Sequence, residues 1–241
     1  MKIATVQFAP GFRQKRENLK RLSVLVQEAA QSGARIVVLP ELCATGYSFM
    51  DKTAAAEEAE VIAPGAMTYD VMASLATKYK VHIFYGLIES DKGKLYNSQV
   101  CISPDKVAES VRKINRWAND FLWAESGRSN PPVVEIDGLR VGLLICRDVR
   151  DKVNSKWTDL YSPGDADVVC LSANWGKGGF PSTSWMDFVE ENKTALVISN
   201  RYGLESNNDF GEGGICIIAK NGQIQCEGLK WSADCIVYGD L

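Results

Sequence analysis

The sequence predicts an α/β fold, and three observations support this prediction. A strand, a helix and a second strand follow one another within the first forty residues with short connections, which is typical of a βαβ unit. Segments 165–173 and 194–200 are short apolar runs, as expected for strands covered on both faces. The chain has 241 residues, of which 46% are hydrophobic, and can bury a substantial core.

In the predicted N-terminal βαβ unit, the spacing of apolar residues changes from that of a strand to that of a helix and back. Apolar residues alternate over 4–8 as in a strand, and RIVVLP (35–40) is a short run typical of a buried strand. Between them, apolar residues recur at helical spacing until Gly33 ends the helix. The residues at this spacing are Leu19, Leu22, Val26, Ala29 and Ala30.

A second helix and a hairpin follow. The apolar stripe predicted for this helix consists of Met67, Val71 and Leu75. VHIFYGLIE (81–89) is predicted to be a strand and YNSQVCI (96–102) its hairpin partner, with the turn at 91–93. Residues 104–131 are charged and then aromatic, and they are predicted to form an irregular active-site segment.

The C-terminal half contains two more hairpins. They are predicted at 133–146 and 213–228, because the Asp-Gly pair at 137–138 and the Asn-Gly pair at 221–222 favour tight turns. The remaining predicted elements are strands at 165–173 and 194–200, a helix over about 183–193, and a final strand at 233–241 that closes the sheet. Since no linker or repeat interrupts this order, we predict one domain over residues 1–241.

Composition excludes several classes of partner. Lys and Arg total 27 against 30 Asp and Glu, which leaves no basic field to bind nucleic acid or an anionic membrane surface. No signal peptide is evident, and no apolar run approaches the roughly 18 residues of a membrane span. The seven cysteines are irregularly spaced, which favours reduced thiols and a cytoplasmic location.

The histidine count excludes several kinds of catalysis. His82 is the only histidine, and its place in a strand-like run predicts a packed residue. Ser-His-Asp and Cys-His mechanisms need an imidazole beside the nucleophile, and most zinc sites also use histidine. There are no paired CxxC units for a four-cysteine zinc site. We therefore expect no metal and no cofactor.

Three reactive side chains are predicted at or near the carboxyl ends of strands, where α/β folds place their sites. Glu41 follows RIVVLP, Lys113 follows the hairpin partner, and Cys146 ends VGLLIC. Taken singly, each has an ordinary explanation as a solvated cap, a surface charge or a core thiol. Together, they suggest a thiol nucleophile with a carboxylate base and an ammonium group.

The segments around these residues resemble three signature blocks of the nitrilase superfamily. The blocks are PEL-x-x-TGY around Glu41, R-K-x-N around Lys113 and G-x-x-IC-R-D around Cys146. Similar segments, such as LSANWG (171–176), extend the resemblance over essentially the whole chain. It implies a four-layer α-β-β-α sandwich, a Glu-Lys-Cys catalytic triad, and a homodimer or higher homo-oligomer formed through a helical face.

The sequence departs from this pattern at three places. Asn115 occupies a position where family members typically have histidine, and Asp120 occupies that of a second glutamate, while Glu125 corresponds to a later acidic residue. The tract after Arg150 differs from the family's usual aromatic-Pro-Glu continuation. This tract lines the entrance to the site in relatives, so these departures concern substrate choice. The segment GGFPSTS (178–184) is predicted to be a loop that shapes the pocket.

The resemblance implies hydrolysis of a non-peptide carbon–nitrogen bond in a small amide or carbamoyl compound. Glu41 would take the proton of Cys146, and the resulting thioester would release ammonia or an amine. Lys113 and the backbone N–H of Arg147 would hold the oxyanion. Asp120 would orient the substrate or hold Glu41 and Lys113 in register.

Other predictions concern the pocket and the packing. The pocket residues are predicted to be Tyr47, Asn174 and Trp175. Trp117 is left open between pocket and packing, whereas Phe121 and Trp123 are predicted to pack in the core or at a dimer contact. Among the other thiols, core positions are predicted for Cys43, Cys101, Cys170 and Cys216, and partial exposure for Cys226 and Cys235.

Two alternatives to an amidase remain. A nitrile hydrolase would use the same thiol chemistry on a nitrile substrate. A binding protein with the same fold would have lost turnover through the changes at Asn115, Asp120 and the tract after Arg150. Greater reactivity of Cys146 than of Cys43 or Cys101 would distinguish an assembled site from such a binding protein.

Overall fold

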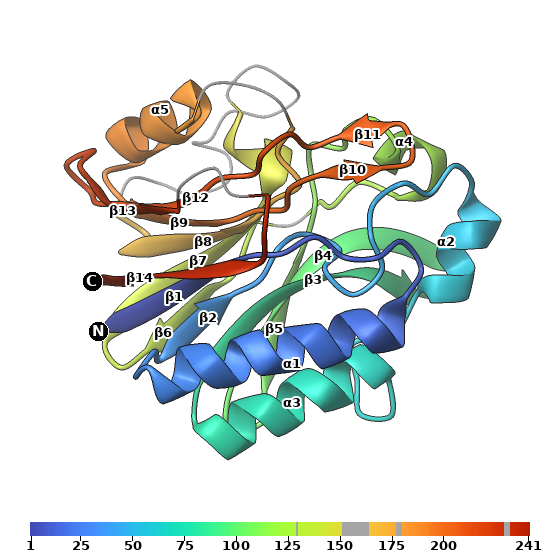
Figure 1. The fold of residues 1–241 in the computed structure, drawn as a ribbon, viewed down its shortest axis with the longest axis horizontal. Coiled ribbons are helices and arrows are strands. Elements are labelled where there is room, and N and C mark those ends of the chain that lie inside the picture. Colours follow the sequence, from blue (N-terminus) through green and yellow to red (C-terminus); the bar gives the residue numbers. More distant parts are fainter. Residues whose placement is uncertain (129, 151–163, 177–179, 229–231) are drawn as a thin grey trace.

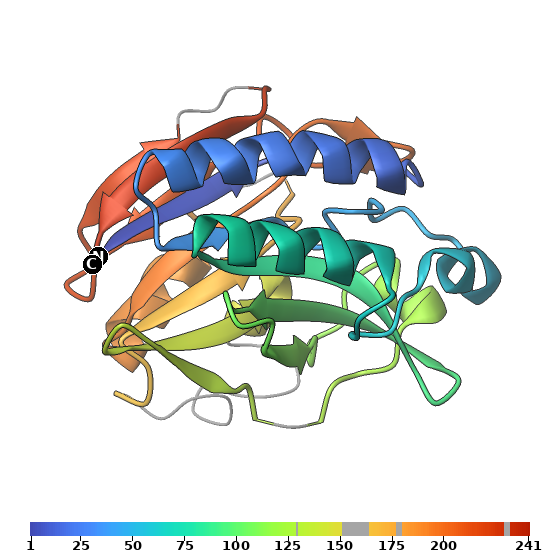
Figure 2. The ribbon, with the colours of Figure 1, turned by 90° about the horizontal axis from the view of Figure 1, so that it is seen from below.

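Two six-stranded sheets pack face to face, with helices on their outer faces (Figures 1 and 2). The computed structural model describes residues 1–128, 130–150, 164–176, 180–228 and 232–241. Helices α1 (Lys15–Gln31) and α3 (Met67–Tyr79) lie side by side on the first sheet, and α5 (Thr183–Asn192) covers the second. This arrangement confirms the predicted α-β-β-α sandwich.

The first sheet has the order β14-β1-β2-β3-β4-β5. Its strands are β1 (Lys2–Gln7), β2 (Ile36–Val38), β3 (His82–Asp91), β4 (Lys94–Ile102), β5 (Ala108–Arg112) and β14 (Cys235–Asp240). The strands β1, β2 and β3 are parallel, as the predicted βαβ unit requires, and the outer pairs are antiparallel. The predicted hairpin between β3 and β4 is therefore confirmed.

The second sheet has the order β13-β12-β9-β8-β7-β6. Its strands are β6 (Val133–Ile136), β7 (Leu139–Ile145), β8 (Val168–Ser172), β9 (Ala195–Ser199), β12 (Ile215–Ile218) and β13 (Ile224–Gly228). The central strands β7, β8 and β9 are parallel, and both predicted hairpins are present at the sheet's edges. The short elements are α2 (Lys52–Glu58), α4 (Asp120–Trp123), the 3₁₀ turn η1 (Cys146–Val149), β10 (Leu204–Glu205) and β11 (Asn208–Asp209).

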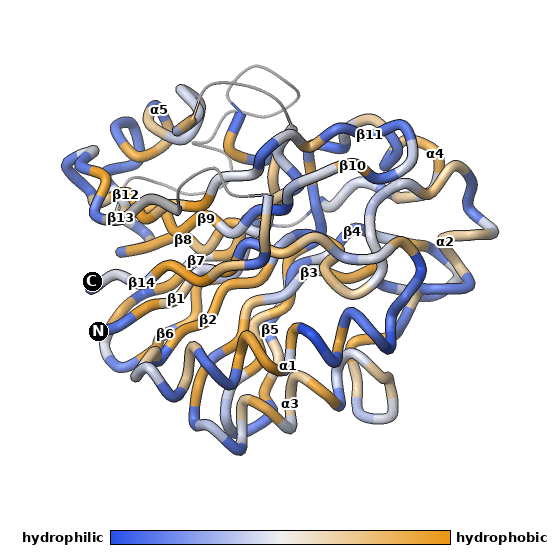
Figure 3. The backbone as a smooth tube through the Cα atoms, in the orientation of Figure 1, coloured by the Kyte–Doolittle hydropathy of each residue, from blue (hydrophilic) through white to orange (hydrophobic). Residues whose placement is uncertain are grey.

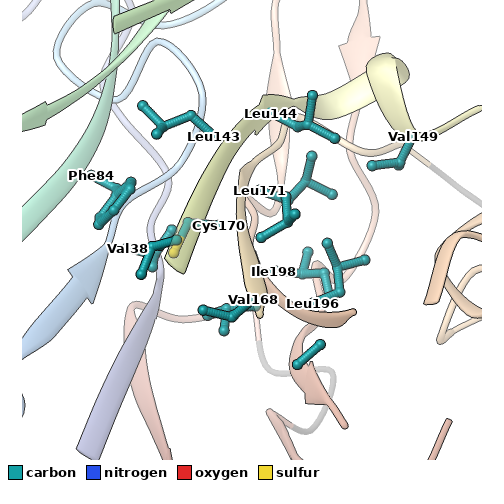
Figure 4. Packing of buried hydrophobic residues seen from close by; sticks show 14 of the residues in the cluster. Val38, Phe84, Leu143, Leu144, Val149, Val168, Cys170, Leu171, Leu196 and Ile198 are labelled. Atoms are coloured by element: carbon teal, nitrogen blue, oxygen red, sulfur yellow. The ribbon is translucent and has the colours of Figure 1, made fainter. Parts of the chain in front are cut away.

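The main core lies between the two sheets. Side chains from both sheets meet there, including Val38, Phe84, Leu143 and Cys170, and Figure 4 shows part of this cluster. Hydrophobic residues gather along the strands, whereas the helices carry hydrophilic turns on their outer sides (Figure 3). Buried hydrogen bonds also join the sheets, since Ser172 Oγ donates to Leu39 O at 2.7 Å. Close packing of the two sheets therefore fixes the positions of the residues at the ends of the strands.

The thiol predictions can be compared with this core. The four cysteines predicted to be core residues are buried, and Cys235 is partly exposed as expected. The side chain of Cys226 lies outside the described part of the structure. His82 begins β3 and is half-buried rather than fully packed.

The structure corrects the buried face of the second helix. Met67 is 38% exposed, and Val71 and Leu75 are only partly buried. The face that packs on the sheet is centred instead on Met72, Ala73 and Ala76, with Thr68 and Tyr69 beside it. The small alanines allow the helix backbone to approach its neighbours closely, which a stripe chosen by hydrophobicity alone does not reveal.

Three further predictions can be compared with the structure. The segment 104–131 is not irregular throughout, because its beginning forms β5 and hydrogen-bonds to the free edge of β4. The predicted last strand is present as β14, and it completes the edge of the first sheet by pairing with β1. Phe121 does not pack in the core, because it is 58% exposed beneath the guanidinium of Arg116, and its packing at a dimer contact stays a prediction.

Two features are absent from the described residues. No helix among them combines the length and hydrophobicity required to traverse a bilayer. In the same residues, no three His, Cys, Asp or Glu side chains cluster in a way that could hold a metal ion.

Candidate active site

The fold brings Glu41, Lys113 and Cys146 together at one end of the two sheets. Glu41 lies just after β2, Lys113 follows the last residue of β5, and Cys146 follows the last residue of β7. All three are buried, with at most 5% of each residue exposed. They come from both sheets, so the site lies where the two sheets meet.

A buried ion-pair network connects the charged residues. Lys113 Nζ donates to Glu41 Oε1 and to Asp120 Oδ2, in both cases at 2.7 Å. One ammonium group therefore lies between two carboxylates, which is the arrangement in which burial of these charges is tolerated. Asp120 Oδ2 also accepts the backbone N–H of Trp117 at 2.9 Å. Asp120 therefore reaches Glu41 through Lys113, and its two predicted roles stay predictions.

The backbone at Cys146 is unusual. Cys146 has φ of 43°, in the left-handed region that residues other than glycine rarely adopt. It is also the first residue of η1, so the chain turns sharply from β7 at the thiol. Such strained backbone is frequent at active sites, where it orients a reactive side chain.

The backbone of Asn174 connects the thiol with the carboxylate. Its N–H donates to Glu41 Oε2 at 2.8 Å. A hydrogen bond from the same backbone group also lowers the pKa of the Cys146 thiol. Glu41 and Cys146 therefore both lie against the backbone of Asn174.

The electrostatic environment favours a neutral thiol in the resting protein. Burial, together with the nearby Glu41, raises the pKa of Cys146 well above that of a free thiol, although Lys113 opposes this. Burial also raises the pKa of Glu41 against the influence of Lys113. For Lys113, burial lowers the pKa, but Asp120 and Glu41 together raise it well above its usual value. Lys113 is therefore charged, and the Cys146 thiol is neutral.

Asn97 is a further residue of the site that the sequence reasoning missed. Its Nδ2 donates to Glu41 Oε1 at 2.6 Å and to Asp120 Oδ1 at 3.0 Å. Its backbone carbonyl accepts the N–H of Lys113 at 2.8 Å. β4 also contains Lys94, Ser98 and Gln99, so the sequence held no signal that set Asn97 apart.

We expect the Asn97→Leu substitution to shift the pH dependence of activity. The hydrogen bond from Asn97 lowers the pKa of Glu41, so its loss leaves Glu41 protonated up to a higher pH. The acidic limb of kcat/KM should move to higher pH, and kcat/KM at neutral pH should fall by roughly 10- to 100-fold. Gln99→Met is the matched control. Gln99 lies on the same face of β4 as Asn97, but its amide donates to Ser172 Oγ and not to a carboxylate. If the acidic limb of kcat/KM does not move in Asn97→Leu, Asn97 does not lower the pKa of Glu41.

Asp148 connects the turn after the thiol with the strand end that carries Lys113. Its Oδ1 accepts the backbone N–H groups of Ile114 at 3.1 Å and Asn115 at 2.8 Å. Burial raises the pKa of Asp148 to about 7, although these hydrogen bonds lower it. Asn115, which departs from the family pattern, is buried at this junction.

A cavity of about 240 Å³ opens at the thiol. The residues that line it are Trp117, Cys146, Arg147, Arg150, Asn174, Trp175 and Gly176. Asn174 and Trp175 therefore lie where the sequence placed them, and Trp117 belongs to the wall. Arg147, predicted for its backbone N–H, also contributes its side chain.

Other predicted site residues lie beside this cavity or outside the described structure. The Tyr47 ring lies 5.9 Å from Lys113 Nζ, and its hydroxyl donates to Trp117 O. Tyr47 therefore supports the wall from behind and does not line the cavity. Trp123 packs in a separate buried cluster as predicted, and Glu125 lies against β4. The tract 151–153 and the glycines at 178–179 lie outside the described residues.

The sequence matches one family model and is similar to individual proteins named nitrilase and amidase. The family model described as carbon-nitrogen hydrolase matches residues 2–241. A protein named nitrilase from Pyrococcus abyssi is 31% identical over 210 residues, which cover 87% of this chain and 78% of that protein. An (R)-stereoselective amidase from Pseudomonas sp. is 27% identical, and the match covers 100% of this chain and 85% of the amidase.

Solved structures support the fold. A mutant of the amidase from Nesterenkonia sp. AN1 superposes with a TM-score of 0.83 at 17% identity, covering 100% of this chain and 93% of that one. The description of that structure states that acrylamide has undergone Michael addition at the active-site cysteine.

Proposed function

The chain belongs to the carbon–nitrogen hydrolase family, and from this premise we propose that it hydrolyses a small amide or carbamoyl compound through a thioester on Cys146. The observation that carries the proposal is the ion pair between Lys113 and Glu41, which is buried next to the thiol that lines the cavity. Relatives named amidase and nitrilase support the reaction class. The assignment of residues 1–241 to one catalytic domain is part of this proposal.

In the first step, the thiol adds to the substrate carbonyl. Glu41 takes the proton of Cys146 as the sulfur–carbon bond forms, and the carbonyl oxygen becomes an oxyanion. Lys113 Nζ and the backbone N–H of Arg147 hold that oxyanion. Removing one such donor typically costs roughly 100-fold or more in rate. The charge of Lys113 is available because its pKa lies well above neutrality.

In the second step, the carbon–nitrogen bond breaks. The protonated Glu41 gives its proton to the leaving nitrogen, so ammonia or an amine departs and a thioester remains. Glu41 then takes a proton from water, whose oxygen attacks the thioester. The acid is released as the sulfur–carbon bond breaks, and Glu41 returns the proton to the sulfur, which restores the thiol. A carboxylate whose pKa is raised by burial and lowered by Lys113 suits both roles.

The pH dependence of kcat/KM should follow the titration of Glu41, the proposed base, and not that of the Cys146 thiol. Activity requires Glu41 deprotonated and Cys146 protonated, so kcat/KM should rise with pH through the pKa of Glu41. Because burial raises that pKa, the limb should be centred above the ordinary value of about 4.3. The pH profile of kcat/KM on a neutral amide tests this. A rise centred near the free-thiol value of about 8.5 would contradict it.

Ammonia release from a panel of substrates tests the proposed function. The panel should contain aliphatic amides, ω-amides, carbamoyl compounds and nitriles. Release from amides or carbamoyl compounds supports the proposal, whereas release from nitriles alone would make the protein a nitrile hydrolase. No release from any compound, with Cys146 no more reactive toward iodoacetamide than Cys43 or Cys101, would instead indicate a binding protein.

The homodimer and the cytoplasmic location remain predictions from the sequence. A dimer through a helical face is what the resemblance implies, and light scattering of the purified protein would test it. No nucleic acid, membrane, metal or cofactor enters the proposed reaction.

A further inference from the structure

Asp148 is a buried carboxyl group that the proposed reaction does not use. It lies in η1, two residues after Cys146, and it is fully buried. Burial raises the pKa of Asp148 to about 7, so its charge is disfavoured at this place. An apolar side chain would avoid the cost of burying a polar group, so the packing of the core does not explain why a carboxyl group is present.

One oxygen atom of Asp148 connects the two sheets at the candidate site. Oδ1 accepts the backbone N–H groups of Ile114 and Asn115, at 3.1 and 2.8 Å. These two donors directly follow Lys113 at the end of β5 in the first sheet, whereas Asp148 follows β7 in the second. The hydrogen bonds therefore join the segment that carries the ammonium group to the turn that carries the Cys146 thiol.

Asp148 also contacts the strand end before the thiol. A hydrogen bond from the backbone of Ile145, the last residue of β7, lowers the pKa of Asp148. Cys146 follows Ile145 with its left-handed φ of 43°. Strained backbone persists only where the surrounding structure holds it, and Asp148 supplies such contacts on both sides of the turn.

The other contacts of Lys113 fix it relative to the first sheet. Its Nζ donates to Glu41, which lies just after β2, and its backbone N–H donates to Asn97 O in β4 at 2.8 Å. The thiol belongs to the second sheet, since Cys146 follows β7. The hydrogen bonds of Asp148 therefore add a direct connection between the backbone next to Lys113 and the turn of the thiol.

We propose that Asp148 is a positioning residue, which holds the Cys146 thiol and the Lys113 ammonium group at the separation that the reaction needs. This inference rests on the proposed function, in which the sulfur attacks a carbonyl carbon whose oxygen is held by Lys113. A displacement of about 1 Å can lower a rate roughly 100-fold. Because the oxyanion forms only as the bond to sulfur forms, a displaced turn should lower kcat and leave KM nearly unchanged.

Two substitutions of similar volume test the role of the acceptor oxygen. Asp148→Leu has no acceptor, and kcat for ammonia release should fall about 100-fold while KM stays within about threefold. Asp148→Asn keeps an oxygen that can accept both N–H groups, so kcat should stay within about tenfold of the unmodified protein. The rescue by asparagine separates the acceptor from the negative charge, which asparagine lacks.

Asp167→Leu is the matched control. Asp167 Oδ2 accepts the backbone N–H of Arg140 at 3.0 Å, at the end of β7 away from the thiol, so its loss should leave kcat within about threefold. Urea unfolding establishes that each variant is folded, and Asp148→Ala takes the place of Asp148→Leu if the larger side chain prevents folding. The proposal is overturned if kcat is unchanged in Asp148→Leu, if the loss lies in KM, or if asparagine does not rescue. Failure of both Asp148→Leu and Asp148→Ala to fold would also overturn it, because Asp148 would then be a folding residue.

Alkylation of Cys146 by iodoacetamide tests the positioning without turnover. Iodoacetamide is itself a small amide: the sulfur bonds to its methylene carbon, iodide leaves, and the thiol proton passes to Glu41 while Lys113 holds the carbonyl oxygen. The rate at Cys146 should be about tenfold lower in Asp148→Leu and close to the unmodified rate in Asp148→Asn, with Cys43 as the internal reference.

The two proposals fail in different ways. If the unmodified protein releases no ammonia but the alkylation rates follow this order, the hydrolase is refuted and the positioning role of Asp148 is kept. If ammonia is released and neither kcat nor the alkylation rate changes in Asp148→Leu, the hydrolase is kept and the positioning role is refuted. Without ammonia release and without faster alkylation of Cys146 than of Cys43, both are refuted.

Discussion

Replacing Cys146 by alanine should lower ammonia release by about 10⁴-fold or more while the fold is retained. The proposed reaction passes through a covalent bond to this sulfur, and no other described thiol lines the cavity. Cys146 belongs to the main core cluster as well as to the cavity wall, but the change to alanine removes only the sulfur atom from this packing. The initial rate of ammonia release with the best substrate of the panel is the measurement.

Cys43→Ala is the matched control for this substitution. Cys43 follows Glu41 by two residues and is fully buried, but its Sγ donates to Gly86 O at 3.5 Å and does not line the cavity. Burial raises the pKa of Cys43 to about 12, so it is inert as a nucleophile. Full activity in Cys146→Ala, or a comparable loss in Cys43→Ala, would contradict the assignment of the nucleophile.

Local patterns were sufficient to predict most of the fold. The strand at 36–38 and the helix before it follow from periodicity, and the hairpin around Asp137 and Gly138 follows from turn chemistry. Both depend on residues near one another in the chain. The pairing of β14 with β1 joins residues more than two hundred positions apart, and no local pattern specifies which sheet such a strand completes.

Some residues of the candidate site could be predicted from the sequence, and others could not. Glu41, Lys113 and Cys146 lie within recognisable blocks, so they could be found before the fold was known. Asn97 could not, because its importance comes from two carboxylates that the fold brings to its amide. The side chain of Arg147 was missed for a related reason: its position over Trp117 depends on the sharp turn after Cys146.

The Lys113→Met substitution should damage both activity and stability. It removes the cation that holds the oxyanion, and it leaves Glu41 and Asp120 buried without their shared partner. Removing one partner of a buried ion pair typically costs about 3–5 kcal/mol in the free energy of unfolding. Urea unfolding followed by tryptophan fluorescence measures this loss, and Lys20→Met is the control, because Lys20 pairs with Glu17 only on the exposed surface of α1.

The stability loss of Lys113→Met should become smaller as the pH falls. Lys113 lowers the pKa of Glu41, so its removal raises that pKa further above the unfolded value of about 4.3. A group whose pKa is raised in the folded state binds its proton more tightly there, so protonation favours folding as the pH falls through the folded pKa. The difference in unfolding free energy from the unmodified protein should therefore be smaller at pH 5 than at pH 7.5.

A triple variant separates this electrostatic cause from the loss of packing. Adding Glu41→Gln and Asp120→Asn to Lys113→Met removes both unpaired charges while the side-chain volumes stay similar. Since neutral replacements of a buried ion cluster are often tolerated, the triple variant should be more stable at pH 7.5 than Lys113→Met alone, with a weaker pH dependence. If the single variant loses more stability at pH 5 than at pH 7.5, or the triple variant is the less stable, unpaired carboxylates are not the cause, and Lys113 acts mainly through the packing of its side chain.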